Sequence, residues 1–495
     1  MPTVPFPPEL LRAAMLEALP ENDQSTEVSR APQFTYVPPS HARALNPDNT
    51  IVEGMRGAGK SHWWAALVNK SHRDYLVAVS PEAKIESSFE ISQGFGVGLD
   101  YTRAPKKDTL ARLQVSYAPR HIWQAVVAVQ SSFPGPFPQA GTTWDVKVGW
   151  VAEHPEEYEG LLHSVTQGLQ RDGRKLLILF DALDRLADDW DGIRPLARAL
   201  FQLSLDLLSN RAIRLKLFVR PDMLEDKQIL AFPDASKLLA KKVTLSWKRA
   251  DLYALLFQCI ANEPINGSVF RAHSASHFRL SWREIGQDGA WVLPVELRSD
   301  DGVQKDVFHA LTGPTMASGQ HGHKRGFPFT WLPNHLVDSR DQVSPRSFFA
   351  ALRYAAAQQS HLGWPYALHY KDIQAGVQEA SRIRVAEITT EDYPWVNLVM
   401  DPLRNSIVVP CEKAEITKLW ARSRTLEQLS SSKGQAPDVQ VKLLPPHFQD
   451  GPSGVLLDLK DLGVIDFATD GRIQMPDVYR IAFGMGRKGG VKPLK

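Results

Sequence analysis

Cysteine is scarce in this chain, which contains only Cys259 and Cys411 among its 495 residues. A disulfide framework requires several cysteines at short spacings, and a cysteine-ligated metal site requires pairs of them. The composition therefore argues against both. It also predicts a protein that resides in a reducing compartment.

The chain also lacks the segments that carry a protein to or through a membrane. Its N-terminus, MPTVPFPPELL, has no basic segment followed by an apolar core, and no apolar run reaches the roughly 20 residues that span a bilayer. The net charge is only +2, so neither nucleic acid nor an anionic membrane attracts the chain as a whole. We therefore expect a cytoplasmic protein without membrane contact.

The remaining composition is that of a soluble globular protein, with 43% hydrophobic and 23% charged residues. A chain of this length forms roughly two to four domains. We expect an N-terminal helix and linker over residues 1–48, a core over 49–263 with an insertion at about 81–155, a helical lid region over 264–362, and a C-terminal winged-helix-like domain over 363–495.

The strongest motif is the loop GMRGAGKS at residues 54–61, which lies between a short apolar strand and a helix. The spacing G-x-x-x-x-G-K-S is typical of a phosphate-binding loop (P-loop), because glycines let the backbone approach an anion at a helix N-terminus. Lys60 can neutralise the outer phosphates, which makes it a catalytic candidate. The residues expected to contact the nucleotide are Gly54, Met55, Arg56, Gly57, Ala58, Gly59, Lys60, Ser61 and His62.

Strands that alternate with helices predict an α/β fold. Five segments have strand character: residues 51–52, 74–80, 175–181, 215–219 and 242–247, whereas residues 81–118 have no regular pattern. Because alternating strands and helices form right-handed crossovers, the sequence predicts a P-loop NTPase core with a parallel five-stranded sheet. A helical lid and the C-terminal winged-helix-like domain are expected to follow.

A second group of candidates follows the buried strand KLLILFD. Asp181 ends this strand and is expected to bind Mg²⁺ together with Ser61, because parallel strands place such a carboxylate beside the ligand crevice. Asp184 could orient water; alternatively, it only caps a helix and pairs with Arg185. Many P-loop ATPases carry a glutamate where this chain has Ala182, so we expect slow hydrolysis.

Two arginines are candidates for sensing the γ-phosphate. Arg220 follows the strand KLFV, where a guanidinium can contact phosphate; the alternative is a salt bridge to Asp222 or Asp184. Arg346 begins the predicted helix SPRSFFAALRYAAAQ in the lid region. Alternatively, the Arg346 side chain is solvated or forms an ion pair within the protein.

Together, GMRGAGKS, FDALDRL, FVRPD and VTLSW resemble the P-loop ATPases of the STAND and KAP groups, over residues 49–263. The resemblance implies that the strand bearing Arg220 lies between the P-loop strand and the strand bearing Asp181. It also implies ATP as the nucleotide. SPRSFFAAL resembles the arginine-bearing lid helix of AAA+-related ATPases. The membrane helices typical of KAP proteins are missing, and the long interval between Ser61 and Asp181 implies the insertion.

Other features leave alternatives open. Trp63 and Trp64 could stack on a base but more often pack a helix, and His321 and His323 are typical of a solvated loop. The C-terminal order of helix, strand, Asp-Gly turn and strand indicates a winged helix for protein or DNA contact.

These features predict an ATP- and Mg²⁺-dependent ATPase or switch, in signalling or prokaryotic defence, with a protein partner or self-association. The alternatives are a nucleotide-dependent DNA-binding protein and a nucleotide-binding scaffold without turnover.

Overall fold

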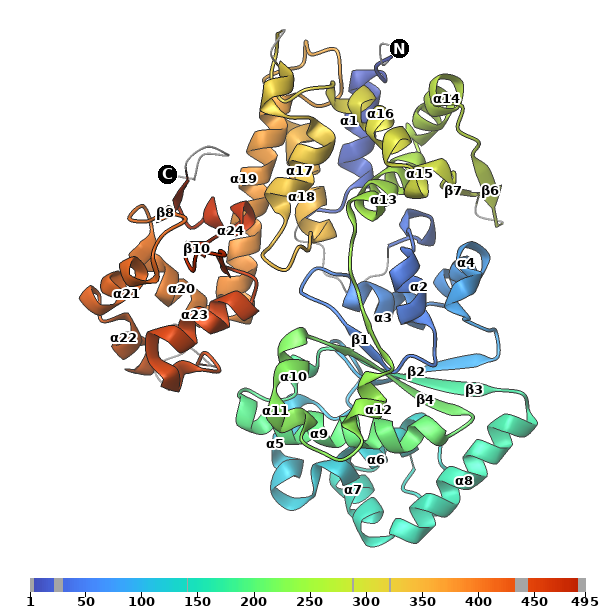
Figure 1. Ribbon diagram of the computed structural model, residues 1–495. Helices are drawn as coiled ribbons and strands as arrows, with labels where there is room; N and C mark the ends of the chain where they lie inside the picture. Colours follow the sequence, from blue (N-terminus) through green and yellow to red (C-terminus); the bar gives the residue numbers. More distant parts are fainter. Residues whose placement is uncertain are drawn as a thin grey trace. The chain divides into compact units, whose positions relative to one another are not determined.

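The computed structural model describes residues 4–21, 30–139, 141–286, 289–319, 322–431 and 444–487 (Figure 1). The chain divides into two compact units. The P-loop unit comprises residues 25–32 and 37–246, and the helical unit comprises residues 1–24, 33–36 and 247–495.

The P-loop unit contains a parallel five-stranded sheet in the order β2-β3-β4-β1-β5, which confirms the predicted fold class. The strands are β2 (Phe89–Phe95), β3 (Lys175–Phe180), β4 (Ile213–Val219), β1 (Ile51–Glu53) and β5 (Lys242–Thr244). The strand preceding Arg220, β4, lies between β1 and β3, as the resemblance implied.

Helices cover both faces of this sheet (Figure 1). Since side chains alternate along a strand, Leu177 and Leu179 of β3 face one layer while Ile178 and Phe180 face the other. The first layer is formed by α2 (Pro39–Leu45), α3 (Lys60–Val68) and α4 (Lys70–Val79). The second is formed by α6 (Pro119–Gln130), α7 (Trp144–Glu153) and α9 (Trp190–Asp206). Burial of β3 on both faces explains its continuous apolar sequence.

The prediction of a strand at residues 74–80 is wrong, because this segment belongs to helix α4 (Lys70–Val79). The side chain of Asn69 caps the helix by accepting a hydrogen bond from the His72 N–H (3.2 Å). Lys70 and Asp74 pair one turn apart, which also supports a helix. The apolar residues of DYLVAV are not all buried, as they would be in a central strand. Leu76 is buried whereas Val77 is 46% exposed, as on a helix with one buried face.

The missing fifth strand is β2 (Phe89–Phe95), in a segment expected to be irregular. Its glycine, Gly94, and its polar residues weaken the strand pattern. The structure shows why Gly94 is needed: a Cβ there would lie 2.3 Å from the ring of Phe180 on the neighbouring strand. Packing between strands, rather than local propensity, therefore determines this edge of the sheet.

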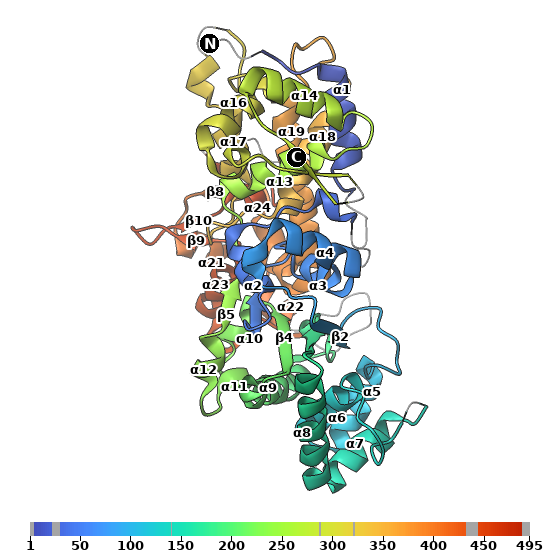
Figure 2. The ribbon, with the colours of Figure 1, turned by 90° about the vertical axis from the view of Figure 1, so that its right-hand side faces the viewer.

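Four helices that begin between residues 107 and 155 lie at one end of the P-loop unit (Figure 2). They are α5 (Lys107–Ser116), α6, α7 and α8 (Pro155–Arg171). Trp123 of α6 packs edge-on against Phe180 and donates a hydrogen bond to the Leu196 carbonyl (2.8 Å). The region expected as an insertion therefore contributes directly to the core beside the sheet. Three short helices follow β4: α10 (Pro221–Glu225), α11 (Lys227–Leu230) and α12 (Ala235–Leu239).

The larger hydrophobic core of the helical unit is built mainly from helices. The longer ones are α1 (Pro8–Ala18), α13 (Arg249–Ala261), α14 (Gly267–Phe278), α16 (Asp301–Thr312), α17 (Pro328–Leu336), α18 (Pro345–Ala357) and α19 (Tyr370–Ala386). The N-terminal helix α1 packs against α18 and α13 through Leu11, Met15 and Ala18, all fully buried. It is therefore a packed arm of this unit.

A second core in the same unit covers residues 385–485. It contains α20 (Pro394–Met400), α21 (Lys413–Arg422), α22 (Thr425–Ser431) and α23 (Gly451–Asp461), then strands β9 (Asp466–Phe467) and β10 (Ile473–Gln474) and helix α24 (Asp477–Arg480). The order helix, strand, turn, strand and helical turn is the predicted one. Assignment to the winged-helix class remains a prediction. In the part of the chain that the structure describes, no helix has the length and apolar character needed to cross a membrane.

Candidate phosphate-binding site

The loop after β1 has the backbone shape that its glycines predict. The N–H of Gly54 donates to the Val219 carbonyl (3.1 Å), which fixes the start of the loop to β4. Gly57 and Gly59 have φ angles of 76° and 103°, in the region that other residues rarely adopt. Helix α3 begins directly after Gly59, so the free N–H groups of its first turn lie at the loop.

Gly54 is also required for space. A Cβ at this position would lie 3.2 Å from Cγ of Lys60 and 3.3 Å from Cβ of Ala58. Such contacts are tighter than ordinary van der Waals packing, so a side chain here would displace the lysine.

Lys60 lies over its own loop. Its ammonium donates to the carbonyls of Gly54 (2.5 Å) and Met55 (3.1 Å). Burial lowers the pKa of Lys60 to about 8, although the charge of Asp181 opposes this shift. A phosphate oxygen carries more negative charge than a carbonyl and is therefore a stronger partner for this ammonium.

The two predicted metal ligands, Ser61 and Asp181, are neighbours. Asp181 is only 7% exposed, and its backbone N–H donates to the Phe95 carbonyl (3.0 Å). The Ser61 hydroxyl lies close enough to the Asp181 carboxylate to lower its pKa. Burial raises the pKa of Asp181, while the Ala182 N–H, the charge of Lys60 and the Ser61 hydroxyl act in the opposite direction. A neighbouring hydroxyl and carboxylate offer oxygen ligands of the kind that Mg²⁺ prefers.

The chain turns sharply after Asp181. Ala182 has φ 55° and ψ 38°, a left-handed conformation that is unfavourable for a residue other than glycine. The short turn Leu183–Arg185 follows and brings Asp184 toward the neighbouring strand end. This conformation places a methyl group, and no acid, directly after the metal candidate.

Arg220 bridges two carboxylates. Its guanidinium lies 3.3 Å from Oδ2 of Asp184 and 3.3 Å from Oδ2 of Asp222. Both ion pairs that the sequence offered as an alternative are therefore present. The charges of Arg220, Asp184 and Asp222 all influence the pKa of Lys60, so the ends of β1, β3 and β4 converge on one site. Asp222 joins this site, although its position next to Arg220 suggested only an ion pair.

Arg346 lies in the helical unit, at the start of α18. Its guanidinium pairs with the Glu387 carboxylate at 2.6 Å. Glu387 begins a π-helical turn, Glu387–Asp392, and also lies 3.5 Å from Arg384. A structural partner for Arg346 is therefore present, and contact with phosphate remains a prediction.

His62 and the two tryptophans belong to helix α3. Trp63 is 1% exposed, and its indole N–H donates to Nδ1 of His41 (3.0 Å), so it packs the helix rather than stacking on a base. The His62 ring contacts Trp63 and His72 edge-on, and burial lowers its pKa to about 3. His321 and residues 488–495 lie outside the described residues.

The parallel sheet and the loop after β1 define a P-loop NTPase domain. No family model matches the chain, and no curated protein matches its sequence. The chain is similar to solved structures of the ORC2 protein of Aeropyrum pernix, in ADPNP–ADP complexes (14% identity, TM-score 0.39) and in the ADP form (14%, 0.32). It is also similar to Cdc6p of Pyrobaculum aerophilum (12%, 0.30). Each comparison covers 90% of this chain and 93% of the other. At these TM-scores the likeness carries no argument about function.

Proposed function

We propose that this chain is a Mg²⁺-dependent, ATP-binding switch protein that hydrolyses ATP slowly, of the type that its motifs share with the STAND and KAP groups. The observation that supports this most directly is that the Ser61 hydroxyl lies close enough to the Asp181 carboxylate to lower its pKa. The start of the P-loop helix and the end of β3 therefore meet where a phosphate-bound Mg²⁺ requires its oxygen ligands.

The residues of the site fit both ATP and Mg²⁺. Backbone N–H groups of the loop and the ammonium of Lys60 would bind the phosphates, and Ser61 and Asp181 would hold the metal. Bound Mg²⁺ would supply positive charge to the outer phosphate oxygens. Lys60 would exchange its bonds to the Gly54 and Met55 carbonyls for phosphate oxygens.

The side chains that we expect beside the γ-phosphate favour sensing of the bound nucleotide over rapid hydrolysis. Arg220 would contact the phosphate, which competes with its ion pairs to Asp184 and Asp222. Asp184 would then be free to orient water. Because Ala182 provides no second acid beside Asp181, Asp184 is the remaining carboxylate for this task, and we expect slow hydrolysis.

In this proposal the helical unit responds to the nucleotide. Arg346 would sense phosphate by exchanging its Glu387 partner for it, and the helical unit would then present a changed surface to a protein partner or a second copy of the chain. Signalling and prokaryotic defence are the processes in which such a switch would act.

The test compares ATP binding and phosphate release in the wild type, Lys60→Ala and Asp181→Asn. Lys60→Ala should weaken ATP binding about 30-fold or more, because a phosphate charge loses its partner. Asp181→Asn should remove the Mg²⁺ dependence of binding. Lys70→Ala is the matched control, since this lysine is exposed on the adjacent helix and pairs only with Asp74 among the described contacts. ATP binding and turnover that are unchanged in Lys60→Ala would contradict the proposal.

A scaffold that binds nucleotide without turnover is the second candidate, and the lack of an acid at Ala182 favours it. Tight ATP binding with no phosphate release over hours would support it. The same assay with duplex DNA tests the third alternative: DNA-stimulated phosphate release with a steep salt dependence would indicate a DNA-binding protein instead.

A further inference from the structure

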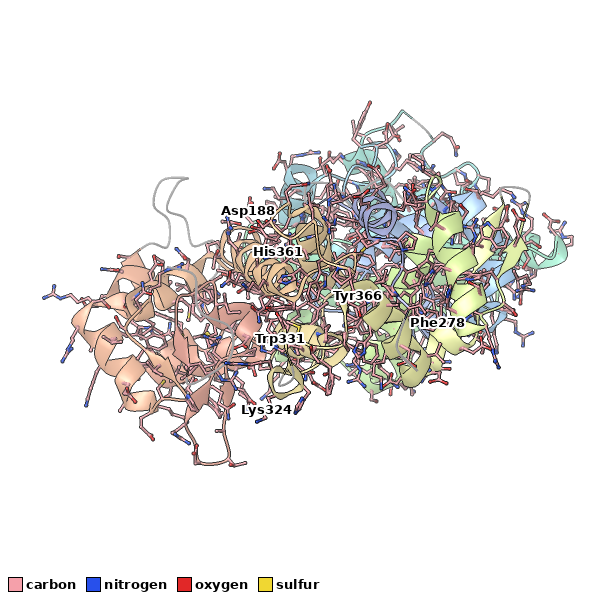
Figure 3. The ribbon with its side chains drawn as sticks, turned by 90° about the horizontal axis from the view of Figure 1, so that it is seen from above. Asp188, Phe278, Lys324, Trp331, His361 and Tyr366 are labelled. Carbon is pink, nitrogen blue, oxygen red and sulfur yellow. The ribbon has the colours of Figure 1, made fainter. Side chains whose placement is uncertain are left out.

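A cluster of two histidines and an aspartate lies at the junction of α18 and α19 in the helical unit. His361 belongs to the connecting loop, His369 caps the N-terminus of α19, and Asp372 lies in its first turn. Figure 3 looks onto this end of the helix pair and labels His361 and Tyr366 of the loop. One ring nitrogen of each histidine and one carboxylate oxygen lie within 4.8 Å of one another.

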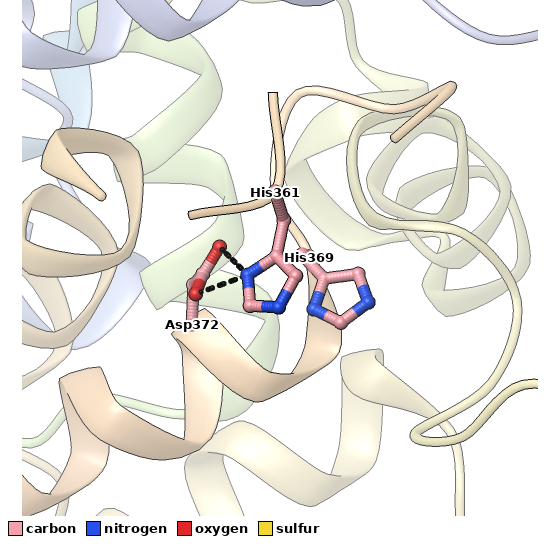
Figure 4. Close-up of side chains that lie close together, drawn as sticks. All are labelled: His361, His369 and Asp372. Atoms are coloured by element: carbon pink, nitrogen blue, oxygen red, sulfur yellow. Dashed lines mark hydrogen bonds and ion pairs between the residues drawn. The ribbon is translucent and has the colours of Figure 1, made fainter. Parts of the chain in front are cut away.

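The His361 ring lies between the other two side chains (Figure 4). Its Nδ1 is 2.9 and 3.1 Å from the two oxygens of Asp372. Its other side stacks on the His369 ring, with centroids 3.9 Å apart and planes 15° apart. The nitrogen lone pair of a neutral imidazole can bind a metal, and each ring offers one such nitrogen to this cluster.

The Asp372 carboxylate is poorly compensated for a buried charge. Its side chain is 11% exposed, and the single partner shown for it among the described residues is the His361 ring. An ionised carboxylate accepts about four hydrogen bonds, and one imidazole N–H supplies one. A buried carboxylate normally requires a full cation or several donors, and a metal ion would meet this requirement.

We propose that His361, His369 and Asp372 bind a divalent transition-metal ion of the Zn²⁺ type, which fastens the loop to the start of α19. Two imidazoles and one carboxylate suit Zn²⁺ and its neighbours, whereas Mg²⁺ prefers oxygen ligands, so the ion differs from the one proposed at the P-loop. With three protein ligands and His361 30% exposed, a water molecule completes the coordination.

The distances require only small side-chain movements. Ligand atoms bound at about 2.0–2.2 Å lie about 3 Å apart around one metal, the spacing that Nδ1 of His361 and Asp372 already have. The metal would take the place of the Nδ1 proton, and the neutral ring would carry its proton on Nε2 instead. His369 must tilt out of its stacked position. Its Nδ1 makes one long hydrogen bond, 3.3 Å, to the Lys371 N–H, which is readily exchanged.

A second group, His447, Asp458 and Asp461, offers a single imidazole. Its Asp458 carboxylate accepts two hydrogen bonds from His447, one from the ring (2.7 Å) and one from the backbone N–H (3.0 Å). His447 therefore serves as the control position.

The experiment measures Zn²⁺ binding to the purified full chain by competition with a chromophoric chelator, in the presence of excess Mg²⁺, which prefers oxygen ligands. His369→Asn keeps a good helix cap while removing the imidazole, and Asp372→Asn keeps the shape of the carboxylate. Each should weaken one Zn²⁺ equivalent about tenfold or more, whereas His447→Asn should bind this equivalent like the wild type.

Co²⁺ provides a second readout, because its visible absorption reports nitrogen and oxygen ligands directly. We expect a Co²⁺ spectrum in the wild type and in His447→Asn that is lost in His369→Asn. Equal Zn²⁺ affinity in the wild type, His369→Asn and Asp372→Asn would overturn the proposal and leave His361 and Asp372 as a hydrogen-bonded pair. Circular dichroism of the metal-free variants confirms that each is folded.

Discussion

Two lysines of the P-loop unit differ in how many of their N–H donors the protein itself uses. Lys216 on β4 is fully buried, and its ammonium donates to three carbonyls, those of Ala44 (2.7 Å), Asn46 (2.9 Å) and Asn49 (2.7 Å). Lys60 is partly buried and donates to two, those of Gly54 and Met55. An ammonium has three N–H donors, so Lys216 is saturated while Lys60 retains a donor for a ligand.

The two lysines also act at opposite ends of β1. Lys216 donates to carbonyls of the segment that precedes β1, whereas Lys60 donates to carbonyls of the loop that follows it. Burial lowers the pKa of both, to about 7 for Lys216 and about 8 for Lys60. A lowered pKa is therefore shared by both lysines, and the number of unused N–H donors is what distinguishes them.

The largest effect on stability is expected from Lys216→Met. Three buried carbonyls would lose their donor, and each unsatisfied group costs about 1–3 kcal/mol before relaxation. We therefore expect the free energy of unfolding to fall by about 2–5 kcal/mol in urea titrations. Lys70→Met, at an exposed position, is the control. If Lys216→Met is as stable as the wild type, the carbonyls find other donors and the contrast with Lys60 disappears.

A pH titration tests the other half of the comparison. The pKa of Lys60, about 8, lies below the ordinary value of 10.5, so the folded protein loses this charge as the pH rises through 8. ATP affinity should fall by up to about tenfold per pH unit above this point, because the phosphates require the charged form.

Calorimetry at pH 8.5 in two buffers of different ionisation enthalpy should reveal proton uptake on ATP binding. The effect on stability has the opposite sign: between pH 8 and 10.5 the unfolded chain binds more protons at this lysine, so its contribution to stability rises with pH. A pH dependence of ATP binding that survives in Lys60→Ala would assign it to another group.

Asp181 extends the comparison to a negative charge. Burial raises its pKa, which means that the ionised form is unfavourable in the folded protein. Asp181→Asn should therefore raise the unfolding midpoint at pH 7, while it weakens Mg²⁺-dependent ATP binding. Thermal unfolding without nucleotide measures the first effect. A lower midpoint would show that the stabilising effects of the Ser61 hydroxyl and the Ala182 N–H outweigh the cost of burying the charge.

The sequence identified those parts of the site that depend on local spacing. The loop at residues 54–61 and the strand ending at Asp181 have strong local patterns, and the resemblance placed β4 between their strands correctly. The prediction failed where tertiary packing decides. The apolar run of α4 imitated a strand, and β2 is stabilised by the close approach of Gly94 to Phe180, which local sequence does not reveal.

Contacts between distant side chains were also beyond sequence reasoning. The alternatives for Arg220 named both Asp184 and Asp222, but only the fold shows that the guanidinium bridges the two. The saturation of Lys216 depends on carbonyls about 170 residues away in the chain. Hydrogen-bond partners of this kind follow from topology, not from residue type.

The smallest expected effect concerns strain beside the site. Ala182 has φ 55°, a conformation that costs an alanine about 1–2 kcal/mol and costs glycine nothing, although glycine loses about 0.5–1 kcal/mol through greater freedom in the unfolded chain. Ala182→Gly should thus raise the free energy of unfolding by up to about 1 kcal/mol. Ala199→Gly, inside helix α9, should lower it by a similar amount. ATP affinity should stay unchanged in Ala182→Gly, because the methyl group supplies no ligand. A stabilised Ala182→Gly protein with altered ATP affinity would show instead that this strained turn positions Asp181 and Asp184 for the nucleotide.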